Sequence, residues 1–291
     1  MIRMPRARLV GRLAALAAAV VGSATLTACA GPASPPPLPD GLAVEVRQGR
    51  LDAADGILVV GFENTGPAPV TIDRFEVLAP TLEPGMTSTE PFELGADDRL
   101  DLRLQLTPAV CDAPAEDAVA TVLVRATTPD GSSEGELTAA DPFDTLARLA
   151  DTDCLAESAA AAADIRMPDA LRSEGEGTAR RAYLDVLVEP AASGDASLQI
   201  GTVYGTTLIN AEGGTDWVVD REVRAGDEPL TITLAVKPAR CDAHAIADDK
   251  RGTILPFGIV TGDGREGRLD LAAGDALKAE LYAYYTERCG L

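Results

Sequence analysis

The chain has 291 residues, and its 46 acidic side chains outnumber its 25 basic ones, which gives a formal net charge of −21 at pH 7. Nucleic acids and anionic lipid headgroups are bound by surfaces rich in lysine and arginine. The charge therefore excludes nucleic acid as a partner. A single histidine, His244, also leaves few ways to build a histidine-based catalytic site.

The N-terminal residues have the parts of an export signal. The first dozen residues contain four arginines and no acid, and residues 13–26 form an apolar run. This run is too short to span a bilayer, and a basic head before such a run is typical of secretory signals. We therefore predict a signal peptide over residues 1–28.

The apolar run ends in Leu26-Thr27-Ala28-Cys29, which resembles the bacterial lipobox. In that family of signals a diacylglyceryl group is attached to the cysteine sulfur, and signal peptidase II cleaves just before the cysteine. The resemblance implies a lipoprotein of a bacterial cell membrane, anchored through Cys29 and facing the extracytoplasmic side. An ordinary secreted protein that is cleaved elsewhere, or an uncleaved anchor, is the alternative.

The lipidated cysteine opens a proline-rich segment. Residues 29–40 contain five prolines and show no periodic pattern. Proline-rich chains favour extended, semi-rigid conformations. We predict that this segment is a stalk that separates the folded part from the membrane.

The rest of the chain contains an internal duplication. The phrase Pro-Ala-x-Cys-Asp-Ala occurs at residues 108–113 and again at 238–243, and TPDGSSEGEL from residue 128 matches TGDGREGRL from residue 261. Repeats of such length indicate duplicated domains rather than a solenoid. The prediction is one domain over residues 41–155 and a second over 156–291.

Four cysteines remain after Cys29, and cysteines of exported chains form disulfides. They are Cys111, Cys154, Cys241 and Cys289. Of the three possible pairings, the duplication selects Cys111–Cys154 and Cys241–Cys289, because each repeat then has its own bond. A zinc site is the alternative, but the cysteines lack CxxC spacing and the chain has one histidine. We therefore predict two disulfides and no metal site.

Short segments of alternating apolar and polar residues predict β-strands, most clearly LDLRLQL at 100–106. Turn residues such as NTGPAP and PDG separate these segments. Many short strands between such turns indicate a mainly all-β fold of two β-sandwiches. The predicted strands are 42–46, 56–64, 70–78, 100–106 and 118–127 in the first repeat, and 183–190, 197–205, 230–236 and 253–260 in the second.

The ends of the repeats are less strand-like. Residues 141–154 and 274–289 have apolar residues at helical spacing and an Asp near their starts, which suits a helix N-cap. We predict that each repeat ends in a short helix tied to its sheet by the disulfide. A final edge strand is the alternative, above all for residues 279–289. Residues 156–164, AESAAAAAD, are predicted to be a connector.

Residues 62–77, FENTGPAPVTIDRFEV, resemble the strand–turn–strand of bacterial immunoglobulin-like envelope domains. The resemblance covers part of each repeat and implies two tandem immunoglobulin-like sandwiches. The chain lacks the Trp-plus-disulfide core pattern of antibody domains, because Trp217 lies outside the segments between paired cysteines. Residues 241–253, CDAHAIADDKRGT, are similar to exported lipoproteins of actinobacteria, and this similarity implies a compartment without implying a function.

Motifs for catalysis and cofactor binding are missing. No P-loop or dinucleotide-binding fingerprint occurs, and no nucleophile elbow is predicted. The acidic turns at 129–136 and 262–267 lack the spacing of a calcium-binding EF-hand loop, and we expect hairpin turns there. We predict neither an enzyme nor a cofactor. Two alternatives stay open: a hydrolase that uses paired carboxylates, and a glycan or small-ligand site around Trp217 and Tyr204.

One loop differs between the repeats. After Cys-Asp-Ala the first repeat continues PAEDAVAT, whereas the second continues HAIADDKRGT and is longer. A loop fixed at its root by a disulfide can present such groups for recognition, although a solvated turn is the simpler interpretation. The candidate recognition residues are His244, Asp248, Asp249, Lys250 and Arg251.

These features together predict a membrane-anchored lipoprotein that acts as a non-catalytic binding or scaffold module of the cell envelope. The partner would be an envelope protein complex, for example a transporter with this chain as an accessory subunit.

Overall fold

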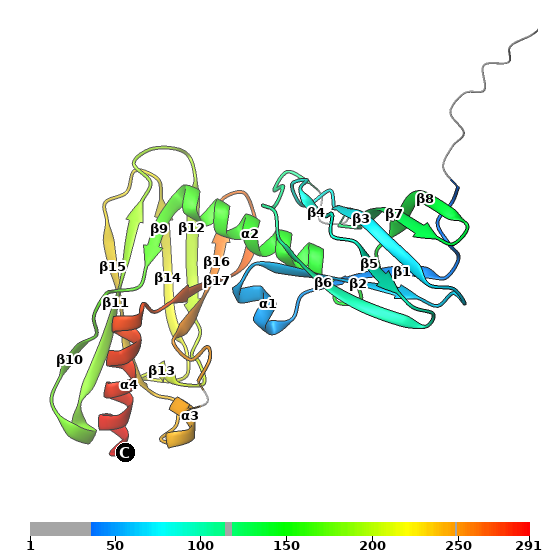
Figure 1. Ribbon diagram of the computed structural model, residues 1–291. Coiled ribbons are helices and arrows are strands. Elements are labelled where there is room, and N and C mark those ends of the chain that lie inside the picture. The colour runs from blue at the N-terminus through cyan, green and yellow to red at the C-terminus, as the bar shows by residue number, and fades with distance from the viewer. Residues whose placement is uncertain (1–35, 114–117, 248) are drawn as a thin grey trace, which may run out of the picture. The chain divides into compact units, whose positions relative to one another are not determined.

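The computed structural model describes residues 36–113, 118–247 and 249–291 (Figure 1). The predicted signal peptide, the lipidation site Cys29 and most of the stalk lie outside these residues, as does Asp248 of the predicted loop. Over the described part of the chain, no helix is both long enough and apolar enough to cross a membrane.

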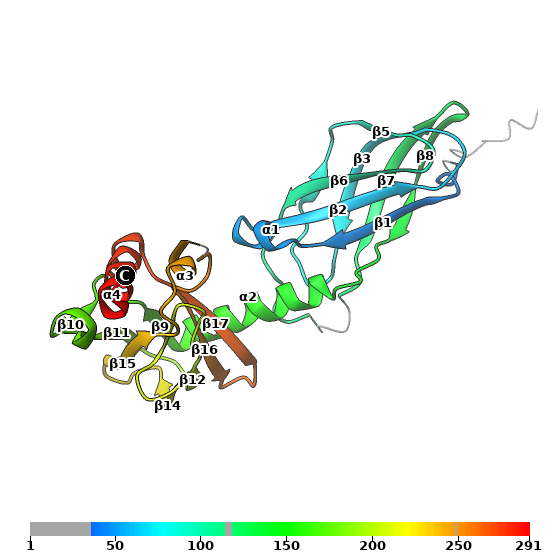
Figure 2. The same cartoon turned by 90° about the horizontal axis from the view of Figure 1, so that it is seen from below.

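The first repeat is a sandwich of two antiparallel sheets, with β1, β2 and β6 lying over β3, β7 and β8 (Figure 2). One sheet has the order β1-β2-β6, and the other has the order β4-β3-β7-β8, with β5 also paired to β3. The bounds are β1 Leu42–Arg47, α1 Arg50–Ala54, β2 Ile57–Asn64, β3 Val70–Leu78, β4 Met86–Ser88, β5 Phe92–Leu94, β6 Asp98–Gln105, β7 Thr121–Thr128 and β8 Gly131–Thr138.

Alternate residues of these strands point to opposite faces of each sheet, and one set forms the first core. On β2 the ring of the buried Phe62 packs edge-on against two other rings. Its centroid lies 4.9 Å from that of Phe75 and 5.5 Å from that of Phe92. The neighbouring Gly61 lies on the outer face, where Arg47 donates to Asp101 at 3.0 Å across β2. This hydrogen bond lowers the pKa of the Asp101 carboxyl group.

The second repeat has two antiparallel sheets with an equivalent strand order. They are β10-β11-β15-β13, with β9 also paired to β11, and β14-β12-β16-β17. The bounds are β9 Ala163–Arg166, β10 Arg172–Glu174, β11 Arg181–Pro190, β12 Ser197–Val203, β13 Ile209–Ala211, β14 Trp217–Arg224, β15 Leu230–Pro238, β16 Ile254–Thr261 and β17 Glu266–Ala272, with a 3-10 turn at Gly177–Ala179.

Six strands of each repeat correspond, whereas β10 and β13 of the second repeat have no counterpart in the sheet β1-β2-β6. The path β1-β2-β6 corresponds to β9-β11-β15, and β3-β7-β8 corresponds to β12-β16-β17. Each repeat also has its own cluster of buried side chains. This confirms the predicted fold class of two immunoglobulin-like sandwiches that arose by internal duplication.

Each repeat ends in a helix, as predicted: α2 spans Thr145–Ala162 and α4 spans Asp275–Cys289. Asp141 caps α2, because its carboxylate oxygens accept hydrogen bonds from the backbone N–H groups of Thr145 and Leu146 at 2.8 and 2.9 Å. Because α4 includes residues 279–289, the alternative of a final edge strand there is wrong.

The predicted connector over 156–164 is also wrong, because α2 continues through Ala162 and β9 begins at Ala163. Its alanine run has high helix propensity, and Ala159 and Ala162 of this stretch are buried in the second core. Leu146, near the start of the same helix, is buried in the first core. The helix thus contributes side chains to both cores.

Both predicted disulfides are present. Cys111–Cys154 and Cys241–Cys289 have Cα–Cα distances of 5.3 and 5.2 Å, within the usual range for such bonds. The first bond ties α2 to the segment after β6, and the second ties the end of α4 to the segment after β15. The second bond therefore fixes the start of the loop that the sequence singles out.

Candidate functional site

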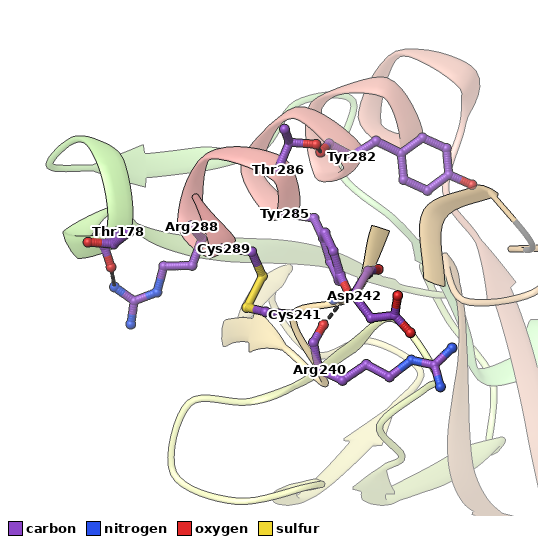
Figure 3. Close-up of a disulfide and its surroundings, with 9 residues drawn as sticks. All are labelled: Thr178, Arg240, Cys241, Asp242, Tyr282, Tyr285, Thr286, Arg288 and Cys289. Atoms are coloured by element: carbon purple, nitrogen blue, oxygen red, sulfur yellow. Dashed lines mark hydrogen bonds between the residues drawn. A yellow bond between two sulfur atoms is a disulfide. The ribbon is translucent and has the colours of Figure 1, made fainter. Parts of the chain in front are cut away.

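The candidate recognition loop follows β15 and contains the short helix α3, Ala243–Ala247. Figure 3 shows its root, where the Cys241–Cys289 bond lies beside Tyr285 of α4. The buried hydroxyl of Tyr285 donates to the backbone oxygen of Arg240 and accepts from the backbone N–H of Asp242 at 3.1 Å. A covalent bond and two hydrogen bonds thus hold the root of the loop against α4.

A second set of contacts fixes the far end of the loop. Asp249 accepts a hydrogen bond from the Tyr282 hydroxyl at 2.7 Å and another from the backbone N–H of Gly252 at 2.5 Å. Burial and the hydrogen bond to Asp249 raise the pKa of Tyr282 to about 12. The hydroxyl of Thr206 donates to the backbone oxygen of Gly252 at 2.6 Å. The loop is therefore held at both ends.

Between these fixed ends the loop presents basic groups to solvent. The His244 side chain is 85% exposed, and its Nδ1 lies 3.1 Å from an Asp242 oxygen that also accepts from the His244 backbone N–H. These two bonds lower the pKa of the Asp242 carboxyl group. Lys250 is exposed, and the exposed Arg251 forms an ion pair with Asp270 of β17.

The predicted loop residues therefore divide by position. His244, Lys250 and Arg251 lie at the surface, whereas Asp249 faces inward and anchors the loop. The roles of Tyr282 and Tyr285 are not among the sequence-based predictions. The signal that points to them is the cluster of tyrosines at 282–285, which places aromatic side chains on several faces of α4.

Trp217 and Tyr204 do not form an open platform. The Trp217 side chain belongs to the second core and is 9% exposed, and its indole N–H donates to the backbone oxygen of Ala235 at 2.8 Å. The Tyr204 ring is covered by the Arg268 guanidinium, 4.3 Å from the ring centroid. Stacking on a sugar needs a free aromatic face, so this geometry counts against a glycan site built on Trp217.

Replacing Trp217 with Phe is expected to lower the free energy of unfolding by about 1 kcal/mol, because the ring volume is largely kept while the half-buried Ala235 carbonyl loses one of its two donors and keeps the Glu212 backbone N–H. Urea unfolding followed by far-UV circular dichroism measures the change. A matched Val218→Ala change, at an exposed neighbour on the same strand, should leave stability nearly unchanged. Equal stability of the Trp217→Phe variant and the parent would contradict a structural role for the indole.

Within the part of the chain that the structure describes, neither the one Gly-x-Ser-x-Gly pattern nor a cluster of metal ligands forms a site. The Gly-x-Ser-x-Gly pattern occurs at residues 131–135, which the sequence analysis overlooks. The structure places these residues in β8, where Ser133 is buried, whereas a nucleophile elbow is an exposed turn between a strand and a helix. Within the described ranges, no group of three or more His, Cys, Asp or Glu side chains is placed to hold a metal ion.

A cleft of about 530 Å³ lies between β9 and the start of α4, and the sequence analysis does not anticipate it. Its walls include Ile165, Met167 and Leu277, with Asp169 and Asp275 exposed at its rim. Asp270, also on the rim, forms the ion pair with Arg251. These carboxylates lack the buried surroundings typical of a catalytic acid.

Comparisons with known proteins do not assign the chain to a family. No protein-family model matches the chain, and no curated protein is similar to it in sequence. Among solved structures, a red sea bream transglutaminase aligns at 11% identity and a TM-score of 0.25, over 80% of this chain and 31% of that one. The CupB2 chaperone of Pseudomonas aeruginosa aligns at 13% identity and a TM-score of 0.22, over 76% of this chain and 95% of that one.

A Salmonella enterica structure of the SafA pilin in complex with the SafB chaperone aligns at 13% identity and a TM-score of 0.21, over 81% of this chain and 98% of that one. All of these TM-scores are low, so no property of these proteins is transferred to this chain.

Proposed function

We propose that this protein is a lipoprotein, anchored through Cys29 on the extracytoplasmic face of the cell membrane, that acts as a non-catalytic binding or scaffold module of the cell envelope. It would serve as an accessory subunit of a membrane protein complex. The observation that carries this proposal is the loop at residues 241–252, which is fixed at both ends and presents His244, Lys250 and Arg251 to solvent.

A loop of this kind suits protein recognition for a thermodynamic reason. Ordering a flexible loop on binding costs free energy, about 0.5–1.5 kcal/mol for each immobilised side chain. Here the Cys241–Cys289 bond and the contacts of Asp249 hold the backbone before any partner arrives. His244 and Lys250 are exposed on this loop and would meet an acidic surface on the partner.

The test is crosslinking in intact cells, followed by affinity capture of the lipidated protein and mass spectrometry. A membrane protein complex should be enriched with the parent chain and strongly reduced with a His244→Ala/Lys250→Ala variant. An Arg181→Ala variant, which removes an exposed charge from β11, is the matched control and should retain the complex. Equal capture by the parent and the loop variant would overturn the docking role of the loop.

A further inference from the structure

Because the chain is duplicated, the cleft beside β9 in the second repeat can be compared with the equivalent place in the first repeat, which serves as a template. Aligning the repeated Pro-Ala-x-Cys-Asp-Ala phrase places Leu100 at the position of Leu230. Leu100 pairs with Phe62, which pairs with Val44 of β1. Leu230 pairs with Val188, which pairs with Ile165 of β9. Ile165 and Met167 are therefore the counterparts of Val44 and Val46.

Residues on the opposite side of the cleft also have counterparts in the first repeat. The backbone N–H of Ala139 donates to the Ala120 oxygen at 2.9 Å, and that of Ala273 donates to the Thr253 oxygen at 3.0 Å. These equivalent bonds follow β8 and β17, the last strands of the two repeats. Gly274 is therefore the counterpart of Ala140.

The two repeats differ at this position. In the first repeat Ala140 closes the side of the sandwich, because it donates to the Val44 oxygen at 2.9 Å and accepts from the Val46 N–H at 2.8 Å. In the second repeat no hydrogen bond joins Gly274 to Ile165 or Met167 among the described residues. The cleft of about 530 Å³ lies there instead, lined by Ile165, Met167 and Gly274 among others.

The position of the terminal helix explains this difference. Gly274 is itself the N-cap of α4, so the chain turns into a helix at once after β17. In the first repeat the N-cap of α2 is Asp144, four residues after Ala140, which leaves an extended segment free to pair with β1. Leu277, in the first turn of α4, is fully buried and holds the helix against the second core.

We infer that the cleft between β9 and the start of α4 binds an extended peptide segment of a partner protein. The segment would pair with the Ile165 carbonyl and the Met167 N–H as Ala140 pairs with Val44 and Val46. Adding a strand to an exposed sheet edge in this way is a recurring mode of peptide recognition. This inference deepens the proposed binding function and rests on it.

The walls of the cleft define the chemistry of the segment. Ala140, the residue that pairs with β1 in the first repeat, has a small apolar side chain, so the template calls for a small apolar residue at the pairing position of the bound segment. Ile165 and Leu277 give the cleft an apolar wall. Asp169 and Asp275 at the rim favour a basic residue beside the apolar stretch.

The probe for the test is a library of random linear peptides, selected on the detergent-solubilised full-length protein. Enriched peptides should combine alternating small apolar residues with arginine or lysine. In hydrogen exchange, such a peptide should slow exchange in residues 163–171. A selection that enriches no peptide, or peptides that protect another part of the chain, would overturn the inference, as would protection of 163–171 by a second copy of the chain alone.

Two variants make the binding test specific. Met167→Pro removes the backbone donor of the residue that follows β9, and one lost hydrogen bond should weaken peptide binding by about 3- to 10-fold. Ala272→Arg fills the cleft from β17 and provides a second readout if the proline variant unfolds. Asp195→Asn/Glu228→Gln removes exposed charges outside the cleft and is the matched control. Equal binding by the parent and Ala272→Arg would contradict the inference.

The outcome is separable from that of the proposed function. The His244→Ala/Lys250→Ala variant leaves the cleft intact and should bind the selected peptides as the parent does. Failure of peptide binding would remove the cleft as a site without changing the capture result for the loop. Loss of complex capture on the loop variant, with peptide binding kept, would show that the two surfaces act independently.

Discussion

Replacing Cys241 and Cys289 with serine is expected to lower the free energy of unfolding of the second repeat by about 4 kcal/mol, the entropy of closing a loop of this length in the unfolded chain. The loop encloses β16, β17 and α4, and α4 buries Leu281, Tyr284 and Tyr285 in the second core. Without the bond, α4 and the root of the recognition loop lose their covalent connection.

The single tryptophan of the chain makes this prediction easy to measure. Trp217 lies in the second core, so its fluorescence during urea unfolding reports on the second repeat. A Cys111→Ser/Cys154→Ser variant is the matched control. The loop that its parent bond closes encloses β7 and β8 of the first repeat, so the Trp217 transition should move less. A Cys241→Ser/Cys289→Ser variant with an unchanged urea midpoint would contradict the prediction.

Most of the strands that sequence patterns predict have one buried apolar face, and β6 is the exception, because its leucines alternate with polar residues although none of its side chains is fully buried. The segments at 42–46, 56–64 and 70–78 match β1, β2 and β3 within a residue at each end. Strand β17, by contrast, has no fully buried side chain, and β8 buries only Ser133. These last strands lie at sheet edges, where the apolar alternation that reveals a strand is weak.

The sequence indicates one of the two candidate binding surfaces, the loop, and not the other, the cleft. The loop is visible in the sequence because the repeats share Cys-Asp-Ala and then diverge, and the disulfide that fixes its root follows from the same duplication. The cleft is not visible, because it depends on how far the backbone runs before a helix begins. Gly274 and Ala140 look alike as small residues after a strand, yet one caps a helix and the other extends an edge.

The other prediction with a large expected effect concerns Cys29, which precedes the described residues. Replacing Cys29 with serine should move the protein from the membrane fraction to the soluble fraction. The lipobox resemblance implies a diacylglyceryl group on the Cys29 sulfur, and serine has no thiol with which to form that thioether. Two acyl chains give stable anchoring, whereas a single chain binds membranes only reversibly. The net charge of −21 gives the folded part little affinity for anionic lipids.

Membrane fractionation and metabolic labelling with a fatty acid measure this outcome together. The parent should pellet with membranes and incorporate the label, and the Cys29→Ser variant should do neither. Thr27→Ser keeps a small residue before the cysteine and is the matched control, which should behave as the parent does. Retention of an unlabelled Cys29→Ser variant in the membrane would show that the apolar run of residues 13–26 is itself the anchor. Failure of the parent chain to incorporate the fatty acid label would contradict the lipoprotein proposal.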